Sequence, residues 1–121
     1  MGDTLLATKS MDLAIRIINL NKYLKKEKRE YVLSNQLLRS GTSIGANIRE
    51  AKFAQSTLDF ISKMSIALKE ANESLYWLEL LNKTEYLSDS EYTSIYNDCD
   101  EVLRMLHSTV RTSKKKLEKP K

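Results

Sequence analysis

Apolar residues recur along most of this chain with the spacing of an amphipathic helix. Between residues 6 and 24, leucine and isoleucine return every three, four or seven positions, which places them on one face of a helix. Three later segments keep a similar period, and no strand-length run alternates apolar with polar residues. The pattern predicts four helices, over about residues 8–26, 32–54, 56–83 and 88–113, the last one ending near 113 or 116.

One apolar stripe on each predicted helix is expected to face a common core. The four stripes are Leu6, Leu13, Ile17, Leu20 and Leu24; Leu37, Gly41, Ile44, Ile48 and Ala51; Phe60, Ile61, Met64, Ala67, Leu68, Ala71, Leu75 and Leu78; and Tyr92, Ile95, Cys99, Val102, Leu103, Leu106 and Val110. The chain has three glycines and a single proline, Pro120, so little interrupts helical structure. Four amphipathic helices with short links favour an all-α fold, an antiparallel four-helix bundle.

Polar residues mark the expected helix starts. Ser56 and Asp59, and likewise Ser88 and Glu91, have the spacing of a capping box, with aspartate replacing the usual glutamate in the first pair. The polar residues at 34–35 are the candidate entry to the second helix.

The second predicted helix contains the unusual stretch RSGTSIGANIREA, residues 39–51. A glycine inside a helix costs about 1 kcal/mol relative to alanine. Because Gly41 and Gly45 lie on or beside the core stripe, we interpret them as positions where a neighbouring helix approaches closely. A phosphate cradle is the alternative, but the stretch lacks the GxxxxGK[ST] pattern and no strand precedes it.

A polar ladder follows one flank of the same helix. It consists of Arg39, Ser43, Asn47 and Glu50. A structural interpretation has Asn47 and Glu50 bonded to an adjacent helix, or Arg39 and Glu50 solvated. The alternative is a functional surface near a groove, and the sequence leaves both open.

Further apolar residues lie away from the expected core. They are Met11, Ile15, Ile18, Phe53, Ile66, Tyr76, Trp77 and Leu80. A single exposed apolar residue needs no explanation, but contiguous stripes on two helices are typical of subunit contacts. We therefore expect a homo-oligomer in which Tyr76 and Trp77 dominate the contact.

Length and composition favour one domain. A chain of 121 residues with 41% apolar content can bury a single core, which predicts a bundle at 1–113 and a basic tail at 114–121. No run of 18 apolar residues and no signal-peptide pattern is present. Cys99 is the only cysteine, so an internal disulfide or CxxC site is impossible. These features predict a cytoplasmic protein.

The net charge of +4 is unevenly distributed. Residues 111–121 carry +5 and residues 22–30 carry +3, and an antiparallel bundle places these two clusters at opposite ends. Such clusters bind phosphates with an affinity that falls with salt. The candidate nucleic-acid-binding residues are Lys22, Lys25, Lys26, Lys28, Arg29, Arg49, Lys52, Arg104, Arg111, Lys114, Lys115 and Lys116. The alternative is a solvated loop, solvated helix faces and a solubilising tail.

Residues suited to catalysis are scarce. His107 is the only histidine, and its position on the fourth helix is typical of an exposed side chain. Cys99 falls on the core stripe, where a buried thiol is ordinary. Without a second histidine, a cysteine pair or a Glu-x-x-His motif, we expect no metal site, no cofactor and no enzymatic activity.

Two segments resemble a bacterial protein family encoded within intervening sequences of 23S rRNA genes. They are QLLRSGTSIGANIREA, residues 36–51, and STLDFISKMSIALKEANESLYWLELL, residues 56–81. The resemblance extends from Lys9 to Leu106. It implies an up-down-up-down bundle that assembles into a ring, a pentamer, with nucleic acid as a suspected partner. Members often carry Glu-Gly after Asn-Ile, whereas Glu50 precedes Ala51 here, so the helix is expected to end later, near Gln55.

Two functions are compatible with these features. The first is an oligomer that binds nucleic acid, with RNA as one candidate ligand. The second is an interaction scaffold for a protein partner such as a polymerase. The accessory protein of diversity-generating retroelements, which works beside a reverse transcriptase, is similar in architecture to this family.

Overall fold

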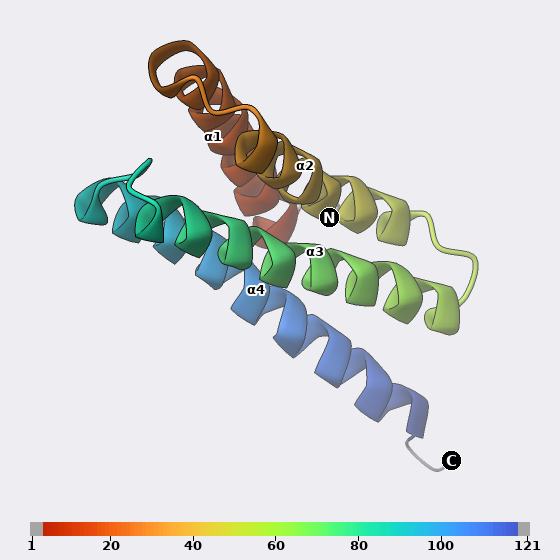
Figure 1. The fold of residues 1–121 in the computed structure, drawn as a ribbon. Helices are drawn as coiled ribbons and strands as arrows, with labels where there is room; N and C mark the ends of the chain where they lie inside the picture. Colours follow the sequence, from red (N-terminus) through yellow and green to blue (C-terminus); the bar gives the residue numbers. More distant parts are fainter. Residues whose placement is uncertain (1–3, 119–121) are drawn as a thin grey trace.

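The computed structural model describes residues 4–118, which form four helices and no strand (Figure 1). The helices are α1 (Leu5–Lys28), α2 (Val32–Lys52), α3 (Thr57–Lys83) and α4 (Asp89–Glu118). The predicted all-α four-helix fold is confirmed. α4 continues past the expected end at 113 or 116, so the lysines at 114–116 are helical. The last three residues of the expected tail lie outside the described residues. None of the four helices has the length and apolar character needed to cross a membrane.

The helices pack as an antiparallel bundle. α1 and α2 form a hairpin, α3 packs against α2, and α4 packs against α3 and α1. Ile17 lies opposite Gly41, and Ser10 lies opposite Gly45, so residue numbers fall along α1 as they rise along α2. Figure 1 shows the α1–α2 and α3–α4 turns at one end of the molecule, with the α2–α3 connection and the end of α4 at the other. The two basic clusters are thus at opposite ends, as expected.

The predicted stripes form the core. Most of their residues are buried, including Leu13, Ile17 and Leu24 of α1 and Leu106 of α4. The residues of the stripes that are only half-buried are Leu20, Phe60, Leu68, Leu75, Tyr92 and Leu103. Several buried residues fall outside the predicted stripes: Ser10, Asn21, Ser34, Ser40, Ser74, Leu81 and Leu87. Many of these are polar, which is why an apolar pattern did not identify them.

The two glycines of α2 have different structural roles. A Cβ at Gly41 would clash with Cδ1 of the buried Ile17, so a larger residue there would force the Ile17 side chain or the two helices to shift, and glycine permits their close approach. A Cβ at Gly45 would meet Ser10 Oγ at 3.4 Å, an ordinary contact. The packing interpretation is confirmed for Gly41, whereas nothing in the α1–α2 contact demands glycine at position 45.

The predicted capping box of Ser88 and Glu91 is present, and that of Ser56 and Asp59 is present in part. The Ser88 hydroxyl accepts from the Glu91 N–H at 3.2 Å, and the Glu91 carboxylate accepts from the Ser88 N–H at 2.9 Å. The Ser56 hydroxyl accepts from the Asp59 N–H at 3.0 Å. The carboxylate of Asp59 accepts from the Gln55 N–H rather than from Ser56. The Asp59 carboxylate thus bonds the N–H of the residue before the predicted partner, Ser56.

The predicted start of the second helix at residue 32 is confirmed, but its predicted capping residues and its predicted end, at 54 or near Gln55, are wrong. α2 begins at Val32, and its first three N–H groups, those of residues 32–34, donate to the carboxylate of Glu30 at 3.1, 2.9 and 2.7 Å. This anion caps the helix in place of residues 34–35, and it lies where the helix dipole favours negative charge. α2 ends at Lys52 and not near Gln55, with Phe53 following as the C-cap.

Candidate functional site

The first basic cluster lies on the last turns of α1 and the start of the α1–α2 turn. We call it the turn cluster: Lys22, Lys25, Lys26, Lys28 and Arg29. Lys25 is half-buried and the other four are exposed. None of the five forms a salt bridge within the described residues, whereas earlier on α1 Lys9 pairs with Glu101 at 3.2 Å and Arg16 pairs with Asp98 at 2.7 Å. The cations of the turn cluster are therefore available to an external anion.

Burial of Glu30 makes this turn more basic than its composition indicates. Only 7% of Glu30 is exposed, and its carboxylate is satisfied by the N-terminus of α2. Five cations remain at the surface against one exposed carboxylate, that of Glu27, which gives a net +4. Lys28 is close enough to Glu91, at the start of α4, to contribute to the lowering of the Glu91 pKa. A bound anion would therefore lie on the α1 side of this end, away from Glu91.

The other predicted cations divide between the ends of α2 and α4. Arg111 and the lysines at 114–116 are exposed on the last turns of α4 and form the second cluster. Arg104 lies two turns earlier on the same face, but it donates to Asp100 at 2.7 Å, and this bond raises the pKa of its guanidinium. Arg49 and Lys52 lie at the end of α2, with the Lys52 ammonium 5.9 Å from the ring centroid of Phe53. The structure thus separates the predicted cations into groups and does not form one continuous patch.

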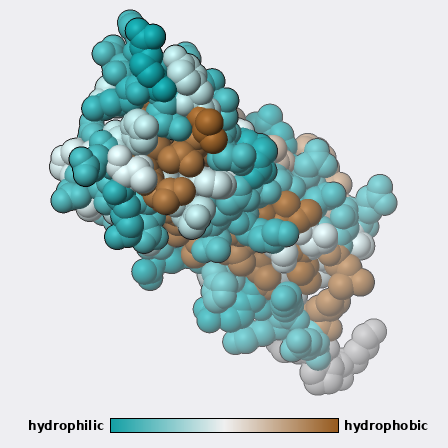
Figure 2. Space-filling model, in the orientation of Figure 1, coloured by the Kyte–Doolittle hydropathy of each residue, from teal (hydrophilic) through white to brown (hydrophobic). Residues whose placement is uncertain are grey.

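Most of the predicted self-association residues are exposed in the single chain. Met11, Ile15 and Ile18 follow one face of α1, with 48%, 51% and 37% of each residue accessible. Phe53, Ile66 and Tyr76 are also exposed, whereas Trp77 and Leu80 are half-buried. Figure 2 shows hydrophobic side chains reaching the surface between hydrophilic ones, away from the hydrophilic tip of the α1–α2 turn at the upper left.

An apolar groove lies between the N-terminal half of α1, the end of α2 and the start of α3. Its volume is about 940 Å³. Met11 and Phe53 line it together with Phe60 and Met64, and Gly45 contributes to the wall. The absence of a side chain at Gly45 therefore shapes the groove, although the α1–α2 contact does not require it.

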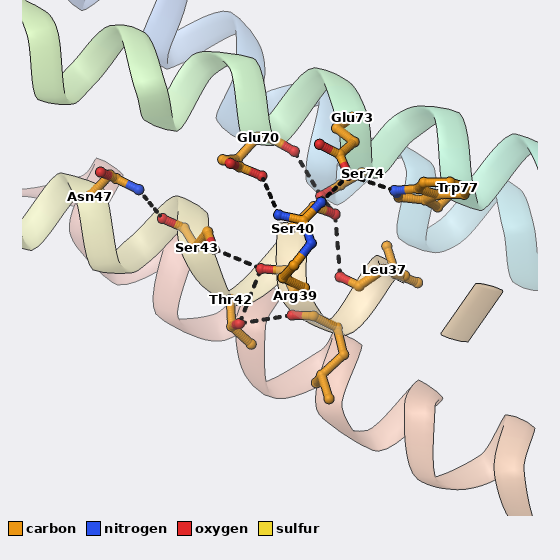
Figure 3. A network of polar contacts seen from close by, with 11 residues as sticks. Leu37, Arg39, Ser40, Thr42, Ser43, Asn47, Glu70, Glu73, Ser74 and Trp77 are labelled. Carbon is orange, nitrogen blue, oxygen red and sulfur yellow. Dashed lines mark hydrogen bonds and ion pairs between the residues drawn. The ribbon is translucent and has the colours of Figure 1, made fainter. Parts of the chain in front are cut away.

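The polar ladder joins α2 to α3 (Figure 3). Arg39 forms ion pairs with Glu73 and, at 3.6 Å, with Glu70 on α3. Glu73 also accepts from the indole N–H of Trp77 at 2.9 Å. Between the same two helices, the buried hydroxyls of Ser40 and Ser74 are hydrogen-bonded at 2.8 Å.

The rest of the ladder makes bonds within α2. Ser43 donates to the Arg39 carbonyl at 2.7 Å, and Asn47 donates to the Ser43 carbonyl at 2.9 Å. Asn47 therefore bonds within its own helix and not to a neighbour. Glu50 is exposed and lines the apolar groove. The structural interpretation of Arg39 is supported in an altered form, because its side chain is 53% exposed and its guanidinium is also paired with α3.

No group of three or more metal-ligating side chains occurs within residues 4–118. His107 is exposed on α4. Burial raises the pKa of the Cys99 thiol to about 12, and the thiol donates to the Ala71 carbonyl at 3.6 Å. A thiol with this pKa stays protonated at neutral pH and is a poor nucleophile.

Residues 3–108 match the protein family described as 23S rRNA-intervening sequence protein. The chain belongs to this family. A crystal structure of a protein of unknown function from the S23 ribosomal protein family of Bacteroides thetaiotaomicron is similar to this family member, with 57% identity and a TM-score of 0.87. The match covers 88% of this chain and 98% of that one. No curated protein matches the chain.

Two features of this family member escaped the sequence analysis. Glu30 was counted only as a charge, although an acidic residue just before a helix is a recognisable capping signal. The Ser40–Ser74 bond could not be inferred, because it depends on the relative register of two helices.

Proposed function

We propose that this protein is a non-enzymatic homo-oligomer that binds nucleic acid through its basic surfaces. The observation that carries the proposal is the turn cluster, with five cations free of salt bridges and a single exposed carboxylate within residues 22–30. When such unpaired cations neutralise phosphates, the counterions condensed on the nucleic acid are released, which favours binding. RNA is the candidate ligand, and a cytoplasmic location accords with that ligand.

Self-association is supported by the apolar stripe of α1 and by the groove beside it. Met11 belongs to both, and Phe53 stands at the groove with 75% of its surface exposed. Covering such surfaces is favourable by roughly 25 cal/mol for each Å² of apolar area removed from water. Repetition of the turn cluster around a ring would multiply weak phosphate contacts. The five-fold ring that the resemblance implies is part of this proposal.

The apolar groove also favours a second candidate function. A partner helix with an apolar face could dock there, which would make the protein an interaction scaffold or an accessory subunit of an enzyme such as a reverse transcriptase. Binding through the groove would survive high salt, whereas binding through the turn cluster would not.

An RNA-binding titration tests the main function. Fluorescence anisotropy of a labelled RNA is followed at several salt concentrations for the wild type and for a variant with Lys25, Lys26, Lys28 and Arg29 changed to glutamine. If all four side chains contact phosphates of a single strand, the negative slope of log K against log salt should be smaller in magnitude by about 3 in the variant. A matched control changes Lys63 and Lys69 of α3 to glutamine and should keep most of the affinity. Equal slopes for the wild type and the four-fold variant would remove the turn cluster from the binding surface.

Light scattering coupled to gel filtration tests self-association. The expected mass is that of five copies of the 14.0 kDa chain. Ile15→Glu should lower the mass, because it places a charge in the proposed contact, while Leu58→Glu, at a more exposed apolar position of α3, should not. The mass of a single chain for the wild type would contradict self-association.

A further inference from the structure

Two tyrosines beside the turn cluster are partly exposed. Of the six tyrosines in the chain, Tyr76 packs edge-on against Trp77, and Tyr92 and Tyr96 contact each other. Tyr86 packs against the core. In contrast, Tyr23 and Tyr31 make no ring contact and no side-chain hydrogen bond within residues 4–118, and 36% and 49% of their surfaces are exposed.

The two exposed rings alternate with cations along the chain. Tyr23 directly follows Lys22 and lies one turn before Lys26 on α1. Tyr31 comes two residues after Arg29, at the N-cap of α2. An aromatic ring that lies among lysines and arginines can stack on a base while its neighbours hold the adjoining phosphates. Aliphatic or polar residues would be sufficient if the turn bound phosphates alone.

Arg29 occupies a backbone conformation that normally selects glycine or asparagine. Its φ of 54° and ψ of 32° are left-handed, and its N–H and that of Glu30 both donate to the Leu24 carbonyl. This conformation costs an L-residue roughly 1–2 kcal/mol. Arg29 therefore occupies a position where glycine would be more stable, as does Glu85 in the α3–α4 turn with a φ of 69°, and backbone strain of this kind is found at many functional sites.

We propose that the α1–α2 turn binds single-stranded nucleic acid, with bases stacked on Tyr23 and Tyr31 and phosphates held by Lys22, Lys26 and Arg29. The inference rests on the nucleic-acid function proposed above and adds the form of the strand. In a duplex the faces of the bases are hidden in the stack, and the deep major groove of A-form RNA does not admit side chains. A single strand presents both faces of each base to an exposed ring. RNA and DNA strands share this chemistry.

Anisotropy titrations with four probes of one sequence test the proposal: single-stranded RNA, single-stranded DNA, and the duplex form of each. The full-length protein should bind at least one single strand about 10-fold more tightly than its duplex, since stacking on aromatic rings adds to phosphate contact. Comparison of the two single strands identifies which of them is preferred.

Variants of the two tyrosines separate stacking from charge. Tyr23→Leu and Tyr31→Leu should each weaken single-strand binding about 10-fold and leave duplex binding and the salt slope unchanged. Tyr23→Phe and Tyr31→Phe keep the ring and should keep the affinity, which controls for the loss of surface area and for folding. Equal affinity for strand and duplex, or leucine variants that bind like the wild type, would overturn the stacking proposal while leaving nucleic-acid binding intact. Absence of salt-dependent binding to all four probes would instead reject the proposed function itself.

Discussion

Replacing Gly41 with alanine tests whether the close α1–α2 contact depends on a missing methyl group. Alanine gains about 1 kcal/mol from its higher helix propensity. The new Cβ would clash with Cδ1 and lie 3.1 Å from Cγ2 of Ile17, whose side chain is fully buried and branched at Cβ. Such a side chain has few alternative rotamers, and overpacking of this kind costs about 1–3 kcal/mol. We expect a net loss of about 1 kcal/mol in the free energy of unfolding.

Gly45→Ala is the matched control, four residues along the same helix. Its Cβ would make an ordinary 3.4 Å contact with Ser10 Oγ, so the propensity gain is not offset by a clash. This variant should be more stable than the wild type by about 0.5–1 kcal/mol. The two alanine substitutions are thus expected to have opposite signs.

A double-mutant cycle with Ile17→Val identifies the atom responsible. Valine lacks Cδ1 and alone should cost about 1 kcal/mol. In the Gly41→Ala background the deleted atom is the clashing one, so the double variant should be about 1 kcal/mol more stable than the sum of the single effects. The assay is urea unfolding followed by circular dichroism, at one chain concentration so that any self-association contributes equally. Additive effects within about 0.5 kcal/mol, or stabilisation by Gly41→Ala, would refute the reasoning.

Cys99, Glu91 and Arg39 each give a further testable expectation. With its pKa raised to about 12 by burial, the Cys99 thiol should react with a thiol reagent far more slowly in the folded protein than in urea, and equal rates would contradict its burial. Hydrogen bonds from Ser88 lower the pKa of Glu91 from 4.5. The ionised Glu91 carboxylate therefore stabilises the fold above about pH 4.5, and this stabilisation is lost as the pH falls through the lowered pKa. The urea midpoints at about pH 6 and about pH 3 should thus differ less for Glu91→Gln than for the wild type. Arg39→Met leaves the half-buried Glu70 without its cation and should lower the free energy of unfolding by about 1 kcal/mol, compared with almost no change for the exposed Lys69→Met.

Local periodicity is sufficient to predict most of this fold. The core faces of the four helices were identifiable because a buried stripe repeats every three or four residues, whatever the helix packs against. The capping box of Ser88 and Glu91 was also identifiable, because its partners are three residues apart. The end of α4 was left open between 113 and 116 because the lysines at 114–116 give no apolar signal, although lysine is a good helix former.

For the candidate surfaces, the sequence indicates which charged residues are present but not which of them are paired. Lys9 and Arg16 resemble the turn cluster in sequence, yet both are paired with α4 in the structure. Which cations remain available is decided by the packing of distant helices. The burial of Glu30 likewise depends on the folded structure, since its carboxylate leaves the surface only when it bonds to the N-terminus of α2.

The buried hydroxyl pair of Ser40 and Ser74 determines which movements the bundle permits. Sliding α3 along α2 by one turn, about 5.4 Å, would separate the two hydroxyls and break their hydrogen bond, at about 0.5–1.5 kcal/mol, while each hydroxyl keeps a bond to a carbonyl of its own helix. α1 and α4 are joined across their exposed side by ion pairs such as Arg16–Asp98, whose groups exchange readily with water. The polar contacts between α1 and α4 are therefore more easily exchanged for water than the buried pair that holds α2 against α3.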